Sequence, residues 1–536
     1  MRTALSGAER PQQPTASFWT QDLLLFAATF VVIMLLHAPL LRLPYFWDEA
    51  GYYIPAARDL YLTGALIPHA TPSNAHPPLV LAWLALAWRV AGYSPLVTRT
   101  AMLLVAGFSL FGFFRLARFA ANLPAAWATT ALVALYPVFF TQSSLAHLDL
   151  AAAGFTFWGL LAYLQDRPWK HALWFSLGAL SKETAILAPL ALFAWELFAR
   201  RLPAHWNELA PPSGRRSRSF ILLVPLLPLA CWYGYHYVKT GFLFGNPEFL
   251  RYNVTATLDP LRIPLALGLR LWQVFGYFGL YLLTVAGLLS MRRRPLTANG
   301  DARPRIPIWM QMAFLAVLVA YLGFLSAVGG AVLARYMVPV VPLVMLVMVS
   351  TVWRRVRYWR LVVALVAIAF AVGLFTNPPY GFSIEDNLAY RDYIVMHAEA
   401  NRFLALRYPR SRVLTAWPAS DELSRPWLGY VSRPFPVVRI EDFTPGQIAI
   451  AATATNQFDV VLAFSTKYQP AHPLLQDWAV WQSLKEKYFG YHRDLPPEEV
   501  AQRIGGQVVF QKKGEGQWVT VITLEREEDA ALRTRN

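Results

Sequence analysis

The sequence is organised around one short stretch, residues 46–53, which reads FWDEAGYY. It places two adjacent carboxylates, Asp48 and Glu49, just past the outer end of the first long apolar segment, residues 22–41. Ionisable side chains at the edge of a membrane are costly and tend to mark functional sites. A functional acid pair is therefore one interpretation. A solvated loop pair, or a pair that caps a juxtamembrane helix, is the alternative.

The composition is that of a polytopic membrane protein with room for one soluble domain. Of the 536 residues, 56% are hydrophobic and only 15% are charged, whereas soluble domains carry about 25% charged residues. The net charge of +16 does not indicate nucleic-acid binding, because Arg and Lys cluster in short loops between apolar segments. Such loops set membrane topology and face anionic lipid headgroups. The single cysteine, Cys231, cannot form an intrachain disulfide.

Eleven apolar segments are predicted to cross the membrane, which takes about 20 residues for a helix. They are residues 22–41, 97–117, 124–141, 148–164, 169–181, 184–199, 219–238, 266–290, 307–327, 335–352 and 360–376. The first segment is too long for the apolar part of a signal peptide and lacks a small-residue cleavage site. We therefore expect an uncleaved first span, preceded by a cytoplasmic tail at residues 1–20.

One further apolar run, residues 78–92, is predicted to lie along the outer surface as an interfacial or re-entrant helix. With that assignment every second loop is basic, and basic loops belong on the cytoplasmic side. These loops fall at residues 115–118, 167–170, 200–218, 292–305 and 354–360. If residues 78–92 crossed the membrane, all of these loops would move outside. The loop 41–96 and the C-terminal segment are then external.

This topology brings several isolated polar side chains to the external face. They are Asp48 and Glu49 in the first outer loop, Asp149 after the third span, Lys182 and Glu183 between the fifth and sixth spans, and Arg335 and Tyr336 at the outer start of the tenth. Helix capping by Asp149, an ion pair that serves only packing at Lys182 and headgroup contact by Arg335 are the alternatives. Because all of these side chains are predicted on the external face, we favour the interpretation that they form one site.

His76 stands before Pro77 and Pro78, which fix an extended backbone leading into the surface helix. An imidazole in this position can contact a phosphate or bind a metal, although a lone histidine is more often a plain polar interface residue. His69 and His147 are weaker metal candidates, because no tight ligand spacing links them.

From about residue 377 the composition becomes that of an ordinary soluble domain. Helices are predicted at 386–407, 421–430, 444–455 and 496–504, strands at 411–417, 436–441 and 458–465, and a hairpin at 507–512 with 517–525. Alternating helices and strands indicate a small α/β domain, which we place at residues 377–536. It carries no Gly-rich fingerprint, P-loop or zinc spacing, so no nucleotide cofactor is expected.

Taken in order, these motifs resemble the GT-C membrane glycosyltransferases, in particular the branch with protein O-mannosyltransferases and lipid A aminoarabinose transferases. The matching features are Asp48-Glu49 with Tyr52 shortly after, HPPL at 76–79, Asp149, LSKE at 180–183 and ARY at 334–336. The resemblance covers about residues 20–350 of the chain. It implies inverting sugar transfer on the external face from a polyprenyl-phosphate monosaccharide, such as an undecaprenyl- or dolichyl-phosphate sugar.

The resemblance also implies residue roles. Asp48 matches the first-loop catalytic acid of the family and Asp149 its second-loop acid, while Lys182 and Arg335 fall where the family holds the donor phosphate. The full predicted site adds Glu49 to the catalytic group, and His76, Glu183, Tyr52 and Tyr336 to the substrate-binding group.

Two departures from the family pattern matter. Family members often have Lys before the proline pair, where this chain has His76. The C-terminal domain lacks the β-trefoil insertion of the eukaryotic protein mannosyltransferases, so a protein acceptor is not implied.

The residue types suit this chemistry. An acceptor hydroxyl that attacks the anomeric carbon needs a general base, for which a desolvated carboxylate such as Asp48 is suited. The departing phosphate needs positive charge from Lys182, Arg335 or a divalent metal ion. If the acceptor is itself a phosphate, Asp48 would orient it rather than remove a proton.

The predicted protein is thus an α-helical polytopic membrane protein of the bacterial inner membrane, with about eleven spans and a periplasmic α/β domain. Its predicted partners are membrane lipids, the polyprenyl-phosphate donor and a lipid, glycan or protein acceptor. A transporter or flippase of lipid-linked glycans is the rival hypothesis, and it predicts inverted repeats or broken spans. A scaffold anchored by its spans is the second rival.

Overall fold

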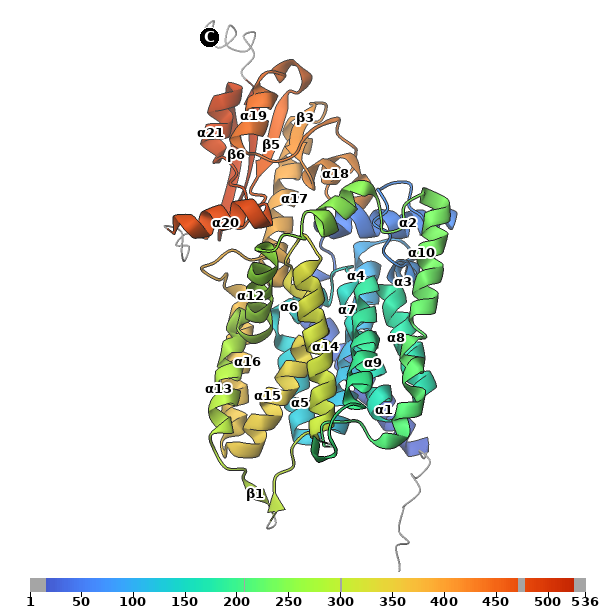
Figure 1. The fold of residues 1–536 in the computed structure, drawn as a ribbon. Helices are drawn as coiled ribbons and strands as arrows, with labels where there is room; N and C mark the ends of the chain where they lie inside the picture. Colours follow the sequence, from blue (N-terminus) through green and yellow to red (C-terminus); the bar gives the residue numbers. More distant parts are fainter. Residues whose placement is uncertain (1–15, 207, 299–300, 471–477, 525–536) are drawn as a thin grey trace, which may run out of the picture.

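The computed structural model describes residues 16–206, 208–298, 301–470 and 478–524. The described chain forms a long bundle of helices and a smaller part of helices and strands, which sits on one end of the bundle (Figure 1). The bundle contains α1 (Ala16–His37), α4 (Pro95–Ala120), α5 (Leu123–Leu135), α7 (Asp149–Leu164), α8 (Pro168–Ser181), α9 (Leu187–Ala199), α10 (Leu226–Thr240), α12 (Arg262–Phe275), α13 (Leu280–Met291), α14 (Ile308–Ala327), α15 (Val341–Arg355) and α16 (Trp359–Phe375).

Within the described residues, five helical segments are long and apolar enough to cross a membrane, and shorter apolar helices lie beside them. The five are Leu23–Leu40, Pro95–Ala120, Arg218–Thr240, Arg262–Met291 and Ile308–Ala327. The chain is therefore a multi-pass membrane protein, as its composition indicated. The count of eleven spans stays a prediction.

Among the predicted spans that are broken in the structure are 124–141 and 266–290. The segment 124–141 divides into α5 and α6 (Pro137–Gln142), because Pro137 has no N–H to donate and Tyr136 before it is extended, with ψ of 123°. The segment 266–290 divides where Phe278 and Gly279 adopt positive φ angles of 49° and 85°. Both breaks lie inside apolar runs, so the hydrophobic pattern did not reveal them.

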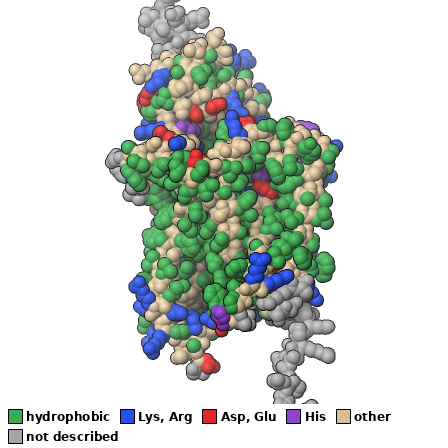
Figure 2. All heavy atoms as spheres, viewed as in Figure 1, with side chains coloured by type: hydrophobic (Ala, Val, Ile, Leu, Met, Phe, Trp, Pro, Cys, Tyr) green, Lys and Arg blue, Asp and Glu red, His purple; other side chains and the backbone are tan. Residues whose placement is uncertain are grey.

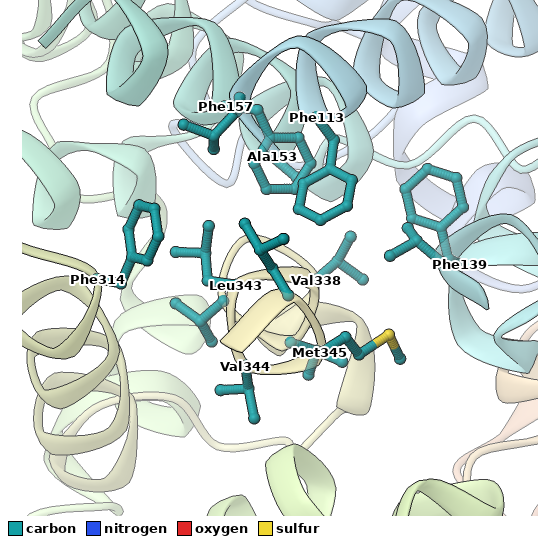
Figure 3. Close-up of a cluster of buried hydrophobic side chains, with 14 of the residues drawn as sticks. Phe113, Phe139, Ala153, Phe157, Phe314, Val338, Leu343, Val344 and Met345 are labelled. Carbon is teal, nitrogen blue, oxygen red and sulfur yellow. The ribbon is translucent and has the colours of Figure 1, made fainter. Parts of the chain in front are cut away.

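The bundle is held by an apolar core to which helices from all along the chain contribute, with α7 packed against α4 and α8. Figure 3 shows the centre of this core, where side chains from α4, α6, α7 and α14 meet those at and before the start of α15. The labelled residues are Phe113, Phe139, Ala153, Phe157, Phe314, Val338, Leu343, Val344 and Met345. This packing supports the segment before α15, which carries Arg335.

The two ends of the bundle differ in charge. Lys and Arg side chains gather at the end opposite the C-terminal part (Figure 2), and the short hairpin of β1 (Thr297–Ala298) and β2 (Asp301–Ala302) marks the same end in Figure 1. The short helices α2 (Ile54–Thr63) and α3 (Leu79–Ala91) lie at the other end, beside the C-terminal part. The sidedness of these two ends across a membrane stays a prediction.

The C-terminal part contains a five-stranded mixed sheet with the strand order β4-β3-β5-β7-β6. The strands are β3 (Val413–Ala416), β4 (Val437–Ile440), β5 (Val460–Phe464), β6 (Gly506–Gly514) and β7 (Gln517–Leu524). Strand β3 runs parallel to β4 and β5, and β7 is antiparallel to β5 and β6. The central strand β5 is buried along its whole length, as its uninterrupted VVLAF sequence requires.

The helices of this part are α17 (Ala389–Arg407), α18 (Ala419–Ser424), α19 (Pro445–Ala452), α20 (Ala479–Phe489) and α21 (Pro497–Ile504). The helix predicted at 421–430 is shorter than expected, because Pro426 prevents its continuation beyond Arg425. Helix α20 was not predicted. Trp417 follows β3 and Lys467 follows β5, so the carboxyl ends of two parallel strands carry residues of the cavity described next, as is common in α/β domains.

Candidate active site between the bundle and the C-terminal domain

A cavity of about 1380 Å³ lies between the bundle and the C-terminal part. Five of the nine predicted site residues line it, namely Asp48, Tyr52, His76, Arg335 and Tyr336. The C-terminal part contributes basic residues to the wall: Arg425, Arg439, Lys467, Lys485 and Arg493. The other four predicted residues, Glu49, Asp149, Lys182 and Glu183, stand outside the lining.

Arg335 is the centre of the site. It lies in a short 3-10 turn, Ala334–Met337, before α15, and its side chain is only 2% exposed. Its Nη2 donates to Asp48 Oδ2 at 2.5 Å, and its Nη1 donates to Glu385 Oε2 at 2.5 Å. Its Nε lies 3.4 Å from Asp149 Oδ2. One guanidinium thus contacts three acidic side chains from segments that lie far apart in the sequence. Its planar group fixes the direction of each contact, which the ammonium group of a lysine would not do.

Lys182 extends this cluster on the bundle side. Its Nζ donates to Asp149 Oδ1 at 2.6 Å and lies 4.0 Å from the centroid of the Tyr336 ring. Asp149 is the first residue of α7, but no side chain caps this helix by a hydrogen bond. The Asp149 side chain instead joins Lys182 to Arg335, so the helix-cap interpretation does not describe its contacts.

Glu49 has a different environment from its neighbour Asp48. Both its carboxylate oxygens accept hydrogen bonds from Arg99, at 2.6 and 2.9 Å. The same two oxygens accept from the backbone N–H groups of Ala146 and Phe46, at 2.6 and 2.9 Å. The side chain is completely buried. These contacts fix the loop to α4, and they leave Glu49 no open path to a ligand in the cavity.

Asp48 faces the cavity with its side chain 22% exposed. It follows Trp47, whose φ of +42° is left-handed, and it precedes a π-helical turn, Glu49–Tyr53. Wide turns of this kind are frequent at functional sites. The backbone around Asp48 therefore separates the two adjacent acids, sending one into the protein and the other toward the cavity.

A second pair joins His76, which lines the cavity, to Glu183 behind it, with 2.9 Å between His76 Nδ1 and Glu183 Oε2. Both side chains are partly exposed. Within the described residues, no three His, Cys, Asp or Glu side chains are grouped so as to hold a metal ion. At the acid cluster itself, positive charge comes from Arg335 and Lys182.

Two acidic residues of the site were not predicted, Glu385 and Asp386 in the turn after α16. Burial raises the pKa of Glu385 to about 8, against the opposing effect of Arg335. Burial likewise raises the pKa of Asp386 to about 7, and Asp386 Oδ2 accepts a hydrogen bond from the Tyr277 hydroxyl at 2.7 Å. Asp48 was singled out because its acid pair follows an apolar span. Glu385 and Asp386 also follow an apolar span, but they were assigned to the soluble domain.

His147, which the sequence suggested only as a weak metal candidate, is a further neighbour of Arg335, with 3.2 Å between its Nδ1 and Arg335 Nη1. Burial, and then the charges of Arg335, Lys182 and Arg99, lower the pKa of His147 well below its ordinary value. The ring is therefore neutral at physiological pH, and it adds no charge to the cluster.

No protein-family model matches the sequence, and no curated protein matches it either. The structure is similar to that of ArnT from Cupriavidus metallidurans in the apo state, with a TM-score of 0.52 and 14% identity over 94% of this chain and 98% of ArnT. ArnT bound to undecaprenyl phosphate gives a TM-score of 0.51 and 15% identity over 95% of this chain and 98% of ArnT.

The archaeal oligosaccharyltransferase AglB from Archaeoglobus fulgidus, in complex with an inhibitory peptide and a dolichol-phosphate, is 12% identical over 94% of this chain and 74% of AglB, with a TM-score of 0.47. ArnT is a membrane glycosyltransferase of the GT-C superfamily. The similarity to ArnT therefore confirms, at the level of the fold, the resemblance that the sequence motifs indicated.

Proposed function

We propose that this chain, which has the GT-C fold, is an inverting glycosyltransferase that moves a monosaccharide from a polyprenyl phosphate to a lipid, glycan or protein acceptor. The observation that carries the proposal is the cluster at Arg335, where Asp48, Glu385 and Asp149 surround one guanidinium at the wall of a large cavity. ArnT has been solved with undecaprenyl phosphate bound, which supports a polyprenyl-phosphate donor here.

The size of the cavity supports a reaction between two substrates. Pockets for one small molecule usually measure about 300–1,000 Å³, and this cavity measures about 1380 Å³. Asp48 and Arg335 come from the bundle, while the C-terminal domain supplies five basic residues to the cavity wall. A donor headgroup at Arg335 would leave the outer half of the cavity for the acceptor.

An apolar groove near the same wall supports a lipid-linked donor. It has a volume of about 540 Å³ and is lined by Leu66, Pro78, Leu180, Leu227, Pro228, Cys231, Trp232 and Tyr235. Pro78 is two residues from His76, and Leu180 is two residues from Lys182. The indole N–H of Trp232 donates to the carbonyl of Ala75 at 2.8 Å, which joins the groove to the His76 segment. A prenyl chain in this groove would enter beside the polar site.

In the proposed reaction the donor phosphate competes with Asp48 for Arg335. When phosphate oxygens take the guanidinium, the Asp48 carboxylate is released to act as a base. It accepts the proton of the acceptor hydroxyl as that oxygen bonds to the anomeric carbon. The bond between the anomeric carbon and the phosphate oxygen breaks, and the lipid phosphate leaves with the electron pair, stabilised by Arg335. A single displacement of this kind inverts the anomeric centre.

The test is sugar release from a panel of radiolabelled polyprenyl-phosphate hexoses and pentoses by the purified full chain in lipid nanodiscs. We expect Asp48→Asn to lower the rate of transfer by roughly 10²- to 10⁴-fold, because a general base is lost. Asp301→Asn, in an exposed hairpin at the opposite end of the bundle, is the matched control and should keep full activity. Undiminished transfer by Asp48→Asn would remove Asp48 from this role.

The same assay separates transfer from transport. Two apolar segments are broken, at Pro137 and at Phe278, and broken spans are a feature of transporters. Free polyprenyl phosphate appearing without any ion gradient supports the transferase. Movement of the intact lipid-linked sugar between leaflets, with no release of the sugar, would favour a flippase instead.

A further inference from the structure

The residue before the proposed catalytic acid has an unusual backbone. Trp47 has a φ of +42°, and left-handed backbone is a genuine outlier for a bulky residue. Such a conformation persists only where surrounding contacts over-determine it, and it is concentrated at functional sites. The contacts that hold Trp47 therefore also decide where the Asp48 carboxylate points.

Those contacts come from the C-terminal domain. The Trp47 ring lies 5.5 Å from the ring of Tyr393 and 5.4 Å from that of Trp417, both in edge-to-face geometry. Phe46 makes a similar contact with Tyr393 at 5.4 Å. Aromatic pairs favour this arrangement. Two rings from one domain thus enclose Trp47, which belongs to the first external loop of the bundle.

Trp417 also contacts the other side of Asp48. A Cβ atom placed on Gly51 would lie only 2.7 Å from Cζ2 of the Trp417 indole, so the indole packs directly on the Gly51 backbone. The Tyr52 ring lies 5.8 Å from the same indole. Trp417 therefore touches the chain both before and after Asp48, and it limits rotation of the short segment between them.

A buried polar pair connects the two enclosing rings. Tyr393 stacks on His397 with 3.8 Å between the ring centroids, and His397 Nδ1 lies 2.8 Å from Glu422 Oε2. Tyr393 and His397 are one turn apart on α17, while Glu422 lies on α18, five residues after Trp417. The His397–Glu422 hydrogen bond thus ties the helix that carries Tyr393 to the segment that carries Trp417.

This pair is poorly explained by stability alone. Both side chains are at most 1% exposed, and His397 Nε2 and Glu422 Oε1 have no hydrogen-bond partner among the described residues. A buried ionisable pair is weak evidence for stability, because its desolvation opposes the attraction between its members. The directional hydrogen bond of this pair can fix the distance between Tyr393 and Trp417. Apolar packing has no such direction and would fix that distance less well.

We propose that the C-terminal domain positions the Asp48 carboxylate through a tryptophan clamp, defined as Tyr393 and Trp417 around Trp47 and Gly51, with the His397–Glu422 pair setting the spacing of the clamp. Tyr393 and Trp417 are positioning residues, since they act through Trp47 and the backbone. The inference rests on the proposed role of Asp48. If the clamp positions Asp48, the C-terminal domain affects the rate of the chemical step itself. This effect is separate from any contact that the domain makes with the acceptor.

The test compares three variants of the full chain in nanodiscs. Tyr393→Leu should lower kcat by about 100-fold, the effect of a misplacement on the order of 1 Å, while KM for the donor stays unchanged. Tyr393→Phe keeps the ring and should restore kcat. Phe403→Leu, on the same helix but stacked on Phe510 at 5.0 Å, is the matched control and should behave like the unchanged protein.

A second measurement does not depend on transfer. Hydrogen–deuterium exchange of the peptide at residues 44–54 should become faster in Tyr393→Leu and stay unchanged in Tyr393→Phe and Phe403→Leu. Unchanged exchange together with unchanged kcat in Tyr393→Leu would overturn the clamp. Faster exchange in a protein that transfers no sugar from any donor would leave the clamp standing and reject the proposed function.

Gly51→Ala provides a variant outside the core of the C-terminal domain, in case Tyr393→Leu does not fold. The added methyl group would push on the Trp417 ring, so we expect faster exchange at residues 44–54 and a fall in kcat with an unchanged donor KM. Normal exchange and normal kcat in Gly51→Ala would contradict the clamp.

Discussion

Asp48 and Glu49 are neighbours in the chain, yet they belong to two different kinds of ionic site. Glu49 is closed in by Arg99 and two backbone N–H groups, and its carboxylate is fully satisfied and fully buried. Among the residues that the structure describes, Asp48 pairs with one cation, Arg335, and part of its surface faces the cavity. The first site joins a loop to a helix, whereas the second leaves charged atoms available to a ligand.

The number of unsatisfied atoms separates the two sites further. Asp149 Oδ2, Glu385 Oε1 and Arg335 Nε are buried without a hydrogen bond among the described residues, although Arg335 Nε lies within ion-pair distance of Asp149. In the closed site both Glu49 oxygens are bonded, and Arg99 Nε is the one atom of the Glu49–Arg99 pair that is buried without a hydrogen bond among the described residues. Unsatisfied buried polar atoms are costly, so the open cluster has hydrogen-bonding capacity for a ligand: Arg335 Nε can donate to an anion, and the two carboxylate oxygens can accept from a hydroxyl group. The comparison predicts that changes in the open site alter catalysis, and changes in the closed site alter stability.

Arg335→Lys should have the largest effect. A lysine cannot keep the two-point geometry toward Asp48 and Glu385, so we expect transfer to fall by about 10³-fold, the upper range for loss of a transition-state donor. Steady-state sugar release measures it. Arg99→Lys is the matched change in the closed site and should lower the thermal unfolding temperature with little change in kcat. An equal loss of kcat in Arg335→Lys and Arg99→Lys would contradict the assignment of catalysis to the open site and of stability to the closed site.

Glu49→Gln should have the next largest effect, on folding instead of on chemistry. Removing one charge of a buried pair typically costs about 3–5 kcal/mol, so the unfolding temperature should drop markedly. The rate of transfer per folded molecule should remain close to that of the unchanged protein. If kcat collapsed while the unfolding temperature stayed constant, Glu49 would belong to the catalytic group, as the sequence motif suggested.

His76→Asn should have an intermediate effect on donor binding. The imidazole lines the cavity beside Glu183 and stands two residues before Pro78 of the apolar groove. We expect KM for the donor to rise by about tenfold, the value of one hydrogen bond to a charged group, with kcat nearly unchanged. A fall in kcat at constant KM would instead place His76 in the chemical step.

Asp386→Asn should have the smallest effect, visible as a change in pH dependence. Burial raises the folded-state pKa of Asp386 from its ordinary value of 3.8 to about 7. The folded state therefore holds this proton more tightly than the unfolded state, and the resulting stabilisation is complete below about pH 3.8 and is lost as the pH rises through about 7.

Between about pH 4 and 7 the unchanged protein should thus lose stability by up to about 1.4 kcal/mol per pH unit, and the loss should level off above the folded-state pKa of about 7. Asp386→Asn stays neutral and should flatten this slope, which chemical unfolding at several pH values measures. Asp392→Asn, a partly exposed acid on α17, is the control and should leave the slope as it was. An unaltered slope in Asp386→Asn would show that another group causes the dependence.

Much of the fold was predictable because hydrophobic runs and breaker residues act locally. Most apolar segments became helices near their predicted bounds, although α10 and α15 begin seven and six residues later than predicted. Strand β5 was expected from the apolar run at residues 460–464, inside the predicted strand 458–465. The breaks at Pro137 and Phe278 were missed, because apolar residues continue on both sides of each break and tertiary packing selects the geometry.

The site was predictable only in part, because sequence reasoning locates charges but does not pair them. Arg335 and Lys182 were assigned to a donor phosphate, and in the structure they hold Asp48, Glu385 and Asp149. Glu385 was missed since it lies past the last span, where the composition indicated a separate domain. The left-handed backbone at Trp47 depends on rings more than 340 residues away in the chain, and no local pattern signals it.

The first external loop also makes direct hydrogen bonds with a distant part of the chain. The Tyr430 hydroxyl donates to the carbonyl of Tyr45, across 385 positions of sequence, and Tyr45 N–H donates to the carbonyl of Leu428. At a synthesis rate of about 5–20 residues per second, roughly 20–80 seconds separate the emergence of these partners from the ribosome. The contacts of Tyr45 with this part of the chain can therefore form only after residue 430 has left the ribosome, well after the helices of the bundle have been made.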